Sequence, residues 1–461
     1  MHPFPNNDED MPLSKFESML KTNDVYFFDS GEFEDIILHY MNLGKMSLAK
    51  RALELGLKQH PEAITLKIVK VEVLVYNDKL DEAEKLLAEL EELEPLNDQI
   101  YLNKASILSK KNKHTEAINA LRTALLYTND EVDVRSLIGM EYLYLEDYKT
   151  ARINFAKCLE IEFEDYSSLY NVIYCYDMTG ENEEAIRFLQ AYLDLNPYSE
   201  IAWHQLGRQH FVVEDFTEAL SAFDYALVID EFFIGAYLEK AKVLEETGKY
   251  ESAIVNYLTT LELNEGSSFT YLRIGSCYEK LGEYKEALKY FNKTIKEDPL
   301  LDKGWLALTD LYLKKKDNEK ALYFINKALD IDKKNVMYWK RYAQININLN
   351  LFEESVRGFK KCLELEEYTL AIFTALIDTL HFLGDFDEAL EIALEAREFY
   401  DDFAEIEYRI SGLNFLLKKP KLGLDFFKNA LRLDYDYHKV AKELYPSIFK
   451  LNGVKILLES E

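Results

Sequence analysis

The sequence contains few of the residues that interrupt helices, and it has no long hydrophobic run. Its 461 residues include only 17 Gly and 9 Pro. A strand-rich chain of this length needs more turn residues, so the composition favours long helices. No run of about 18 apolar residues occurs, which argues against a membrane-spanning helix. Segment 1–12 lacks the basic and apolar regions of a secretory signal, and we expect a cytoplasmic protein.

Cysteine is scarce, and the four Cys residues lie far apart, at positions 158, 175, 277 and 362. They form no CxxC pattern and no cluster with His, which are the spacings that hold zinc or a redox disulfide. We therefore expect buried, reduced thiols, and we predict no disulfide, no metal site and no cofactor.

Positive charge is also in short supply. The chain has 54 Lys and Arg against 83 Asp and Glu, a formal net charge of -29. Such a charge repels the phosphates of nucleic acids and the head groups of anionic lipids. The sequence therefore predicts partners other than nucleic acid or membrane.

Catalytic motifs are missing as well. The sequence has no HExxH, GxSxG, P-loop or dinucleotide-binding glycine pattern. Ser18-x-x-Lys21 matches the SxxK string of serine acyl enzymes, but the companion motifs of that family are lacking, and we attribute the match to chance. We predict that the protein is not an enzyme.

What the sequence has in abundance is a repeat of 34 residues. A small residue recurs at this spacing from Ala49 to Gly423 without insertion or deletion, and ten of the twelve positions are Ala. All three Trp, at 203, 305 and 339, lie sixteen residues before one of these small positions. Six of the small positions are followed four residues later by Phe or Tyr. Three independent positions thus agree on one frame.

Each repeat contains two stretches of helical periodicity separated by a short turn. In the repeat from Ser268, Gly282 is expected to end the first helix, and Pro299 follows the second. The large aromatic residues cannot be buried by one hairpin, so neighbouring hairpins must stack. The sequence predicts an all-α fold, an open solenoid of tandem helical hairpins.

We predict three parts: a flexible tail with a capping helix over 1–29, twelve repeats over 30–437, and capping helices over 438–461. The predicted repeats are 30–63, 64–97, 98–131, 132–165, 166–199, 200–233, 234–267, 268–301, 302–335, 336–369, 370–403 and 404–437. At the start, Ser14-x-x-Glu17 has the form of a capping box and predicts a helix through Lys21. The aromatic cluster 26–28 is expected to seal the first repeat, with a docking role as the alternative. At the other end, Pro446 and Gly453 are expected to interrupt the closing helices.

The repeat resembles the tetratricopeptide repeat, whose pattern is W-x2-L-G-x2-Y, then A-x3-F, then P. Here Trp203-x2-Leu206-Gly207 precedes Ala219-x3-Phe223, and Tyr271-x2-Ile274-Gly275-x2-Tyr278 precedes Ala287-x3-Phe291 and Pro299. The resemblance implies a right-handed superhelical solenoid. Armadillo and pentatricopeptide solenoids have other periods and would lose phase within a few repeats. The eighth place of a repeat is usually small, and four repeats depart from this with a bulky residue that is expected to widen the hairpin: Ile37, Val71, Ile173 and Ile377.

The resemblance also implies that the first helix of each hairpin lines a concave groove. Groove-facing places of the middle repeats combine aromatic residues, amides and cations, which are residue types that carry binding energy at protein interfaces. We expect them to bind an extended or helical, acidic segment of a partner protein. The alternative is that the cations only pair with neighbouring carboxylates such as Glu239, Glu245, Glu246 and Glu279. The candidate residues are Tyr170, Asn171, Tyr174, His204, Gln205, Arg208, Phe211, Lys242 and Arg273.

A second basic stretch lies in the later repeats; solvated lysines are the main interpretation, and a second binding patch is the alternative. Some family members grip a C-terminal carboxylate of chaperones with Lys and Asn at fixed places. Lys340 with Gln344 matches this clamp only in part, so binding of chaperone tails is not predicted. The patch consists of Lys303, Lys314, Lys340, Arg341 and Arg409.

The sequence therefore predicts a non-enzymatic scaffold or adaptor that binds segments of other proteins. The alternative is a regulator or sensor whose superhelical pitch changes when it binds a peptide or an enzyme. The identity of the partners, the pathway and the oligomeric state stay open.

Overall fold

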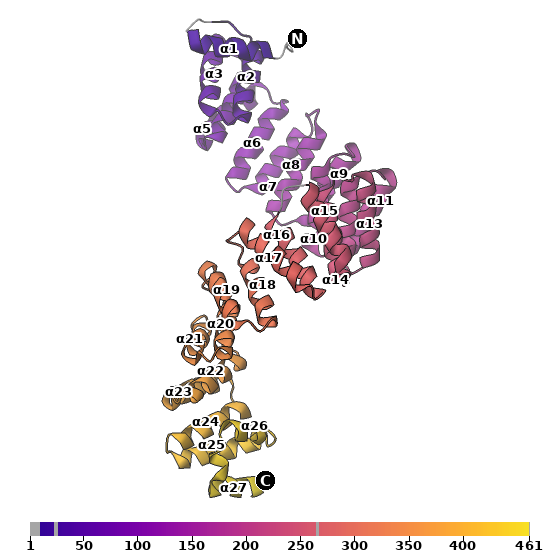
Figure 1. The fold of residues 1–461 in the computed structure, drawn as a ribbon. Helices are drawn as coiled ribbons and strands as arrows, with labels where there is room; N and C mark the ends of the chain where they lie inside the picture. Colours follow the sequence, from indigo (N-terminus) through magenta and orange to yellow (C-terminus); the bar gives the residue numbers. More distant parts are fainter. Residues whose placement is uncertain (1–9, 23–25, 264–266, 461) are drawn as a thin grey trace. The chain divides into compact units, whose positions relative to one another are not determined.

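The structure is a computed structural model that describes residues 10–22, 26–263 and 267–460. Helices joined by short turns make up these ranges, and no strand occurs in them (Figure 1). The prediction of an all-α chain of helical hairpins is confirmed. No helix in the described ranges is long and apolar enough to cross a membrane. The chain divides into two compact units, Met1–Glu231 and Phe232–Glu461, which we describe separately as the N-terminal and the C-terminal unit.

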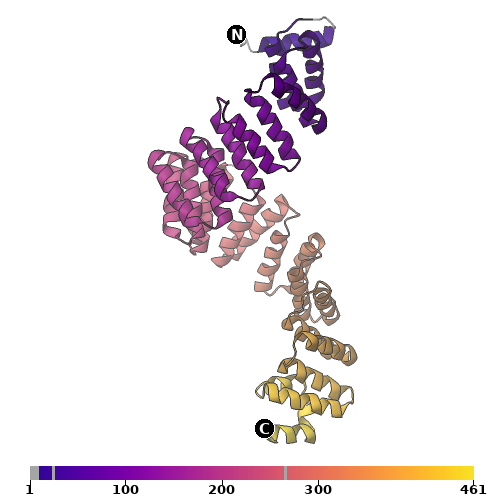
Figure 2. The same ribbon diagram turned by 180° about the vertical axis from the view of Figure 1, so that it is seen from behind.

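The helices of the N-terminal unit follow one another in chain order (Figures 1 and 2). Their bounds are α1 Asp10–Thr22, α2 Ser30–Asn42, α3 Met46–Gln59, α4 Ile64–Tyr76, α5 Leu80–Leu93, α6 Asp98–Lys110, α7 His114–Ala124, α8 Glu131–Tyr144, α9 Tyr148–Ile161, α10 Tyr166–Thr179, α11 Asn182–Leu195, α12 Glu200–Val212 and α13 Phe216–Ile229.

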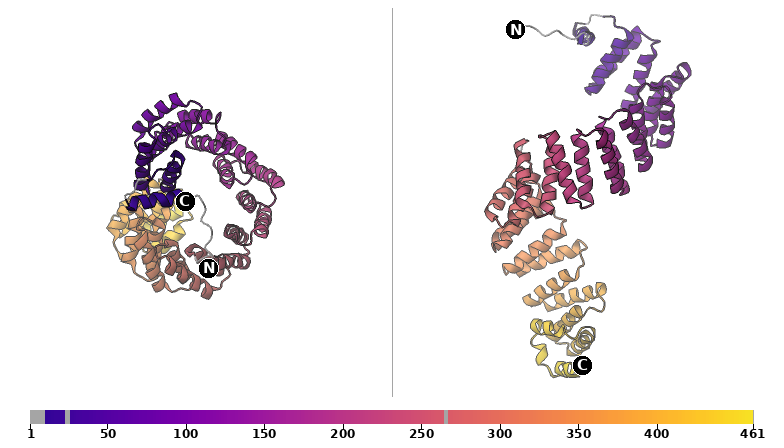
Figure 3. Two further views of the ribbon diagram at one scale, coloured as in Figure 1. Left: turned by 90° about the horizontal axis from the view of Figure 1, so that it is seen from above. Right: turned by 90° about the vertical axis from the view of Figure 1, so that its right-hand side faces the viewer.

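The C-terminal unit continues the same pattern and closes with shorter helices, seen at the yellow end of Figure 3. Its bounds are α14 Ile234–Glu246, α15 Tyr250–Leu263, α16 Ser268–Lys280, α17 Tyr284–Glu297, α18 Asp302–Lys314, α19 Asn318–Ile331, α20 Val336–Asn348, α21 Phe352–Glu364, α22 Leu370–Leu383, α23 Phe386–Phe399, α24 Ala404–Leu416, α25 Pro420–Leu433, α26 His438–Leu444, η1 Ile448–Lys450 and α27 Asn452–Ser460.

Helices α2 to α25 form twelve consecutive pairs. We call the first member of each pair, from α2 to α24, the leading helix, and the second, from α3 to α25, the trailing helix. Leading helices also contact the next leading helix along the chain, as α10 does with α12 and α22 with α24. The turn within a pair uses a residue with positive φ. One example is Gly282, at φ +77°, which follows the end of α16 where the sequence predicts a stop.

The closeness of a pair depends on the eighth place of its repeat. At this place Gly139, Gly207 and Gly275 lie against phenylalanine rings, and a Cβ there would come within 2.6, 2.6 and 2.5 Å of the rings of Phe155, Phe223 and Phe291. The three rings are fully buried in the trailing helices. A glycine therefore lets the two helices approach until the ring fills the space between them.

The four pairs with a bulky eighth residue are less closely packed. In the pairs α2/α3, α4/α5, α10/α11 and α22/α23 the two backbones lie less closely together than in the other eight pairs. Ile37, Val71, Ile173 and Ile377 are buried, and their partners in the trailing helices are smaller than Phe, namely Leu53, Leu87, Leu189 and Ala393. The predicted local widening of these hairpins is confirmed.

The N-terminal capping helix differs from the prediction. α1 begins at Asp10, so Ser14 lies inside the helix and the predicted capping box is wrong. A capping box is present at the start of α2 instead, where the Asp29 carboxylate accepts from the Glu32 amide at 2.8 Å and the Glu32 carboxylate accepts from the Asp29 amide at 2.9 Å. In the aromatic cluster, Phe28 is buried against Phe33, whereas Phe27 is 76% exposed.

The C-terminal helices cover the end of the last pair. Tyr445, Ile448 and Val454 are buried in one cluster with Phe427 of α25. Pro446 stands between α26 and η1, as the sequence predicts. Gly453 does not interrupt a helix, because it is the second residue of α27.

Candidate binding surfaces on the leading helices

The predicted groove residues of the N-terminal unit lie on α10 and α12. Tyr170 and Tyr174, one turn apart on α10, are 44% and 46% exposed. Arg208 of α12 is exposed, and it forms no ion pair in the described part of the chain. Asn171, His204 and Phe211 are half-buried beside them. This surface thus offers two accessible aromatic rings and one accessible cation on helices that contact each other.

Gln205 does not belong to the exposed surface, although the sequence predicts it there. Its side chain is only 1% exposed. Its Oε1 accepts a hydrogen bond from Nη1 of Arg208 at 3.0 Å. Gln205 therefore orients the arginine instead of contacting a partner.

Sequence reasoning missed a second amide on α12. Gln209 is 1% exposed, and its Nε2 donates to Oδ1 of Asp177 on α10 at 2.7 Å. This bond ties the two leading helices together. The sequence contains a sign of this bond: Asp177 and Gln209, two polar residues that can pair, lie 32 residues apart, which is close to one repeat length.

In the C-terminal unit the predicted groove cations, Lys242 and Arg273, already form ion pairs with carboxylates. Lys242 contacts Glu239 of its own helix at 2.7 Å. Arg273 of α16 contacts Glu245 of α14 at 2.7 Å, and the hydroxyl of Tyr257 donates to Glu245 at 3.2 Å. Burial lowers the pKa of Arg273, but Tyr257 and Glu245 outweigh burial and hold that pKa above its ordinary value. In the C-terminal unit the candidate groove cations thus pair with neighbouring carboxylates, which is the alternative that the sequence left open.

The predicted basic patch is largely neutralised in the same way. Lys314 of α18 lies 2.9 Å from Glu279 of α16. Arg341 of α20 lies 3.0 Å from Asp310 of α18. These pairs join consecutive leading helices, and their partners lie 35 and 31 residues apart in sequence.

Arg409 contradicts the prediction of an accessible patch most clearly. It is 5% exposed, and it is held by Asp378 of α22 and by the hydroxyl of Tyr437, which accepts from Nη1 at 3.0 Å. Among the predicted patch residues, only Lys303 and Lys340 are exposed without an ion pair in the described ranges. The structure therefore does not bring the five cations together as one positive surface.

The cysteines are free and buried, as predicted. Burial raises the pKa of the Cys175 and Cys362 thiols to about 11. These thiols are protonated at neutral pH and are poor nucleophiles. No group of three or more potential metal ligands occurs among the residues that the structure describes.

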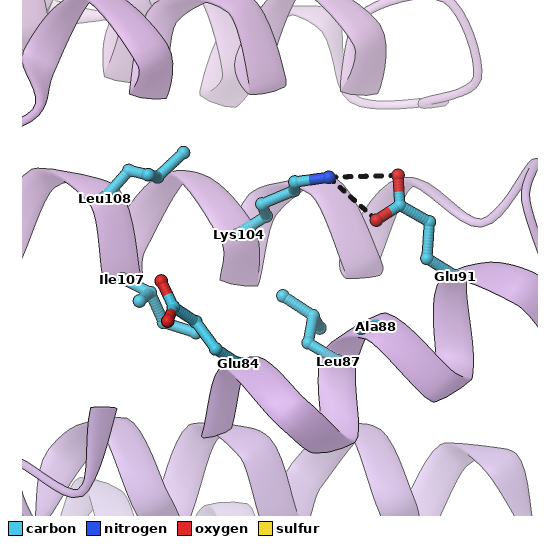
Figure 4. Close-up of a pocket in the computed structure, with 7 residues that line it drawn as sticks. All are labelled: Glu84, Leu87, Ala88, Glu91, Lys104, Ile107 and Leu108. Atoms are coloured by element: carbon cyan, nitrogen blue, oxygen red, sulfur yellow. Dashed lines mark hydrogen bonds and ion pairs between the residues drawn. The ribbon is translucent and has the colours of Figure 1, made fainter. Parts of the chain in front are cut away.

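A small pocket lies between α5 and α6, with a volume of about 190 Å³ (Figure 4). Leu87 and Ile107 supply apolar walls, and Lys104 points toward Glu91 across the opening. Nζ of Lys104 contacts both carboxylate oxygens of Glu91, at 2.7 and 3.0 Å. Glu84, the remaining charged residue of the lining, pairs with Lys111 at 2.9 Å, so the charged groups of this pocket leave little to orient a ligand.

Comparison with known proteins agrees with this architecture. Family models described as tetratricopeptide repeat match residues 69–131, 132–165, 268–299 and 303–335. One curated relative is anaphase-promoting complex subunit 3 of Schizosaccharomyces pombe, 24% identical over 164 residues. The match covers 36% of this chain and spans only a quarter (25%) of the length of that relative.

Several solved structures are also similar. The APC/C hetero-tetramer Cut9-Hcn1 is 14% identical, with 95% of this chain and 92% of that chain covered and a TM-score of 0.36. Yeast Tom70 is 15% identical, with 94% and 98% covered and a TM-score of 0.37. YrrB, described as a TPR protein with an unusual peptide-binding site, is 26% identical, with 40% and 95% covered and a TM-score of 0.35.

The matched family models describe a repeat and not an enzyme family. Proteins built from this repeat bind other proteins. With its 34-residue period, its paired helices and these matches, the chain is a tetratricopeptide repeat protein.

Proposed function

We propose that this chain is a non-enzymatic scaffold or adaptor of the cytoplasm, and that α10 and α12 bind a segment of a partner protein. The observation that carries the proposal is the accessible group of Tyr170, Tyr174 and Arg208 on two adjoining leading helices. Tyr and Arg are the residue types that dominate binding energy at protein interfaces.

The charge of the partner segment follows from the state of Arg208. The other candidate arginine, Arg273, already faces a carboxylate, whereas Arg208 contacts a neutral amide. A carboxylate of the partner can therefore add a charge-assisted hydrogen bond at Arg208 without displacing an existing ion pair. This favours an acidic segment.

Two further observations support a scaffold over a sensor that changes its pitch. Ion pairs join consecutive leading helices at Arg273 with Glu245 and at Arg341 with Asp310, which favours fixed spacing of the hairpins. The similarity to a subunit of the anaphase-promoting complex supports partners that belong to a larger protein assembly.

The test is a pull-down from native cytosol with identification by mass spectrometry. The wild-type chain is compared with the double variant Tyr174→Ala, Arg208→Glu. A matched control changes the same residue types on trailing helices of the C-terminal unit, Tyr323→Ala with Arg357→Glu, because both side chains are exposed there, at 55% and 64%.

We expect a defined set of proteins to be captured by the wild type and by the control variant and to be lost with the α10/α12 variant. Both variants should keep the wild-type helical melting profile. Capture of the same proteins by all three chains would contradict the proposal.

A further inference from the structure

A second surface of the N-terminal unit lies around the trailing helices, and none of the candidate groove residues lines its pockets. Helices α9 and α11 enclose a pocket with a volume of about 270 Å³. Leu159, Phe188 and Ala191 contribute to its apolar walls. At its rim, Phe163 is 45% exposed and Leu195 is 71% exposed. Accessible apolar side chains beside an apolar pocket are the usual features of a protein-docking site.

A larger pocket, of about 560 Å³, lies on the other side of α11, between α11, α12 and α13. Its wall is formed by Trp203 and Tyr225, whose rings stack with centroids 4.6 Å apart. Nε1 of Trp203 donates to the carbonyl oxygen of Pro197 at 2.9 Å, so the indole presents only its apolar face. Leu193 and Leu206 contribute apolar side chains.

All Asp, Glu, Lys and Arg residues that line the two pockets are acidic. Glu160 lines the first pocket, and Asp194 and Glu218 line the second. No Lys or Arg of the described residues lines either of them. An acidic segment of the kind expected on α10 and α12 would be repelled here, whereas Lys or Arg side chains of a partner would meet complementary charge.

The two pockets flank a single helix, α11. The width of a helix with its side chains is about 10 Å, and residues seven apart on a partner helix are separated by a similar distance along its axis. A helix with apolar side chains at positions i, i+3, i+4 and i+7 can therefore reach both pockets at once.

We propose that α9, α11 and α13 form a second binding surface, which takes an amphipathic helix of a partner protein with Lys or Arg side chains beside its apolar face. This goes beyond the proposed function, because its pockets border the trailing helices, with Trp203 and Leu206 of α12 in the wall of the larger one, and because it selects the opposite charge. It uses none of Tyr170, Tyr174 and Arg208.

The probe is a fluorescent peptide with Leu on one helical face and Lys on the other, measured by fluorescence anisotropy with the full chain. A scrambled peptide of the same composition has no apolar face, and a third peptide has Glu in place of Lys. Leu195→Glu adds a negative charge inside the surface. Leu300→Glu adds the same charge in the C-terminal unit, at a side chain that is 76% exposed.

We expect the Leu/Lys peptide to bind the wild type and Leu300→Glu equally, and Leu195→Glu at least about tenfold more weakly, the ratio expected for loss of one buried Leu contact. If only long-range attraction between charges were at work, the added Glu of Leu195→Glu would attract the Lys side chains and the peptide would bind this variant more tightly than the wild type. Equal affinity for the two variants, or equal binding of the scrambled peptide, would overturn the proposal.

A charge-reversed variant gives a second measurement that does not rely on Leu195. Glu160→Lys with Asp194→Lys should weaken the Leu/Lys peptide and strengthen the Leu/Glu peptide, and unchanged preferences would also overturn the proposal. The variant Tyr174→Ala, Arg208→Glu should bind the Leu/Lys peptide like the wild type. Failure of the surface on α10 and α12 is thereby distinguished from failure of this one.

Discussion

Arg409 donates two hydrogen bonds to the carboxylate of Asp378, from Nε to Oδ1 at 2.8 Å and from Nη2 to Oδ2 at 2.7 Å. The two residues belong to consecutive leading helices, α24 and α22, and the guanidinium is almost fully buried. Burial lowers the pKa of Arg409, but the bonds and charge of Asp378 outweigh burial and keep that pKa above its ordinary value. A residue of the predicted basic patch is instead a link between two repeats.

Replacing this arginine should loosen the end of the C-terminal unit. Arg409→Ala leaves the Asp378 carboxylate without its partner, and we expect a loss of about 3 kcal/mol in the local unfolding free energy. Hydrogen–deuterium exchange of α22 and α24 is the measurement. The double variant Asp378→Ala, Arg409→Ala should cost less than the two single changes added together. Strict additivity would show that the pair is not coupled.

Gly207 should not tolerate a side chain. A Cβ at this position would lie 2.6 Å from the ring of Phe223, so Gly207→Ala should destabilise the α12/α13 hairpin by about 1–3 kcal/mol. Thermal unfolding followed by circular dichroism measures the effect. Gly31→Ala is the control, because its Cβ would meet nothing closer than 3.5 Å. Adding Phe223→Leu to Gly207→Ala should restore part of the stability, since Leu189 already accompanies Ile173 in the α10/α11 hairpin.

The buried thiols should make stability fall at alkaline pH. The pKa of Cys175 and of Cys362 rises from the usual 9.0 to about 11 in the folded chain. Each thiol therefore contributes stability that is complete below pH 9.0 and is lost as pH rises through about 11. Chemical denaturation across this range measures the loss, and Cys175→Ala should reduce the slope. A thiol reagent at pH below 9.0 should react with four thiols in denaturant and with none in the native chain.

Removing the Arg341 side chain should lower the stability of the chain by an amount that depends on pH. Burial raises the pKa of Asp310, and the charge of Arg341 opposes that rise. Arg341→Ala should thus destabilise the α18/α20 contact at neutral pH by about 1 kcal/mol, because the pair is partly exposed. As pH falls and Asp310 becomes protonated, its charge no longer needs a partner, and the difference from the wild type should shrink. Denaturation of both chains at neutral and acidic pH checks this, and a constant difference would contradict it.

The repeat frame was predictable because three residue positions recur at one period, and each has a direct structural reason. The small residue and the aromatic rings mark where helices touch, so the hairpins followed from the sequence, including the widening at Ile173. The ends were less predictable, because they have no period. Ser14 has the sequence of a cap, yet the helix extends beyond it to Asp10.

The surface residues were harder to predict than the fold. Neighbours on one helix, such as Gln205 and Arg208, differ in exposure because helix α12 is covered on one side by its neighbours. The ion pairs join residues about one repeat apart, such as Arg409 and Asp378, so a search for opposite charges at that spacing would have found several of them. Which cations remain accessible depends on those pairings, and a single helix considered alone does not contain that information.

Within a hairpin, the size of the side chain at the eighth place is complementary to the size of the facing side chain of the trailing helix. This complementarity also affects which helices pair during folding. If the leading helix α10 closed on the trailing helix α13 of the next repeat, Ile173 would meet Phe223 in a space too small for both. If α12 closed on α11, Gly207 beside Leu189 would leave a void. Similar hairpins in tandem risk exchanging partners during synthesis, and unequal side-chain volumes at this contact penalise the wrong pairings. The irregular eighth places thus help each helix to recognise its own neighbour.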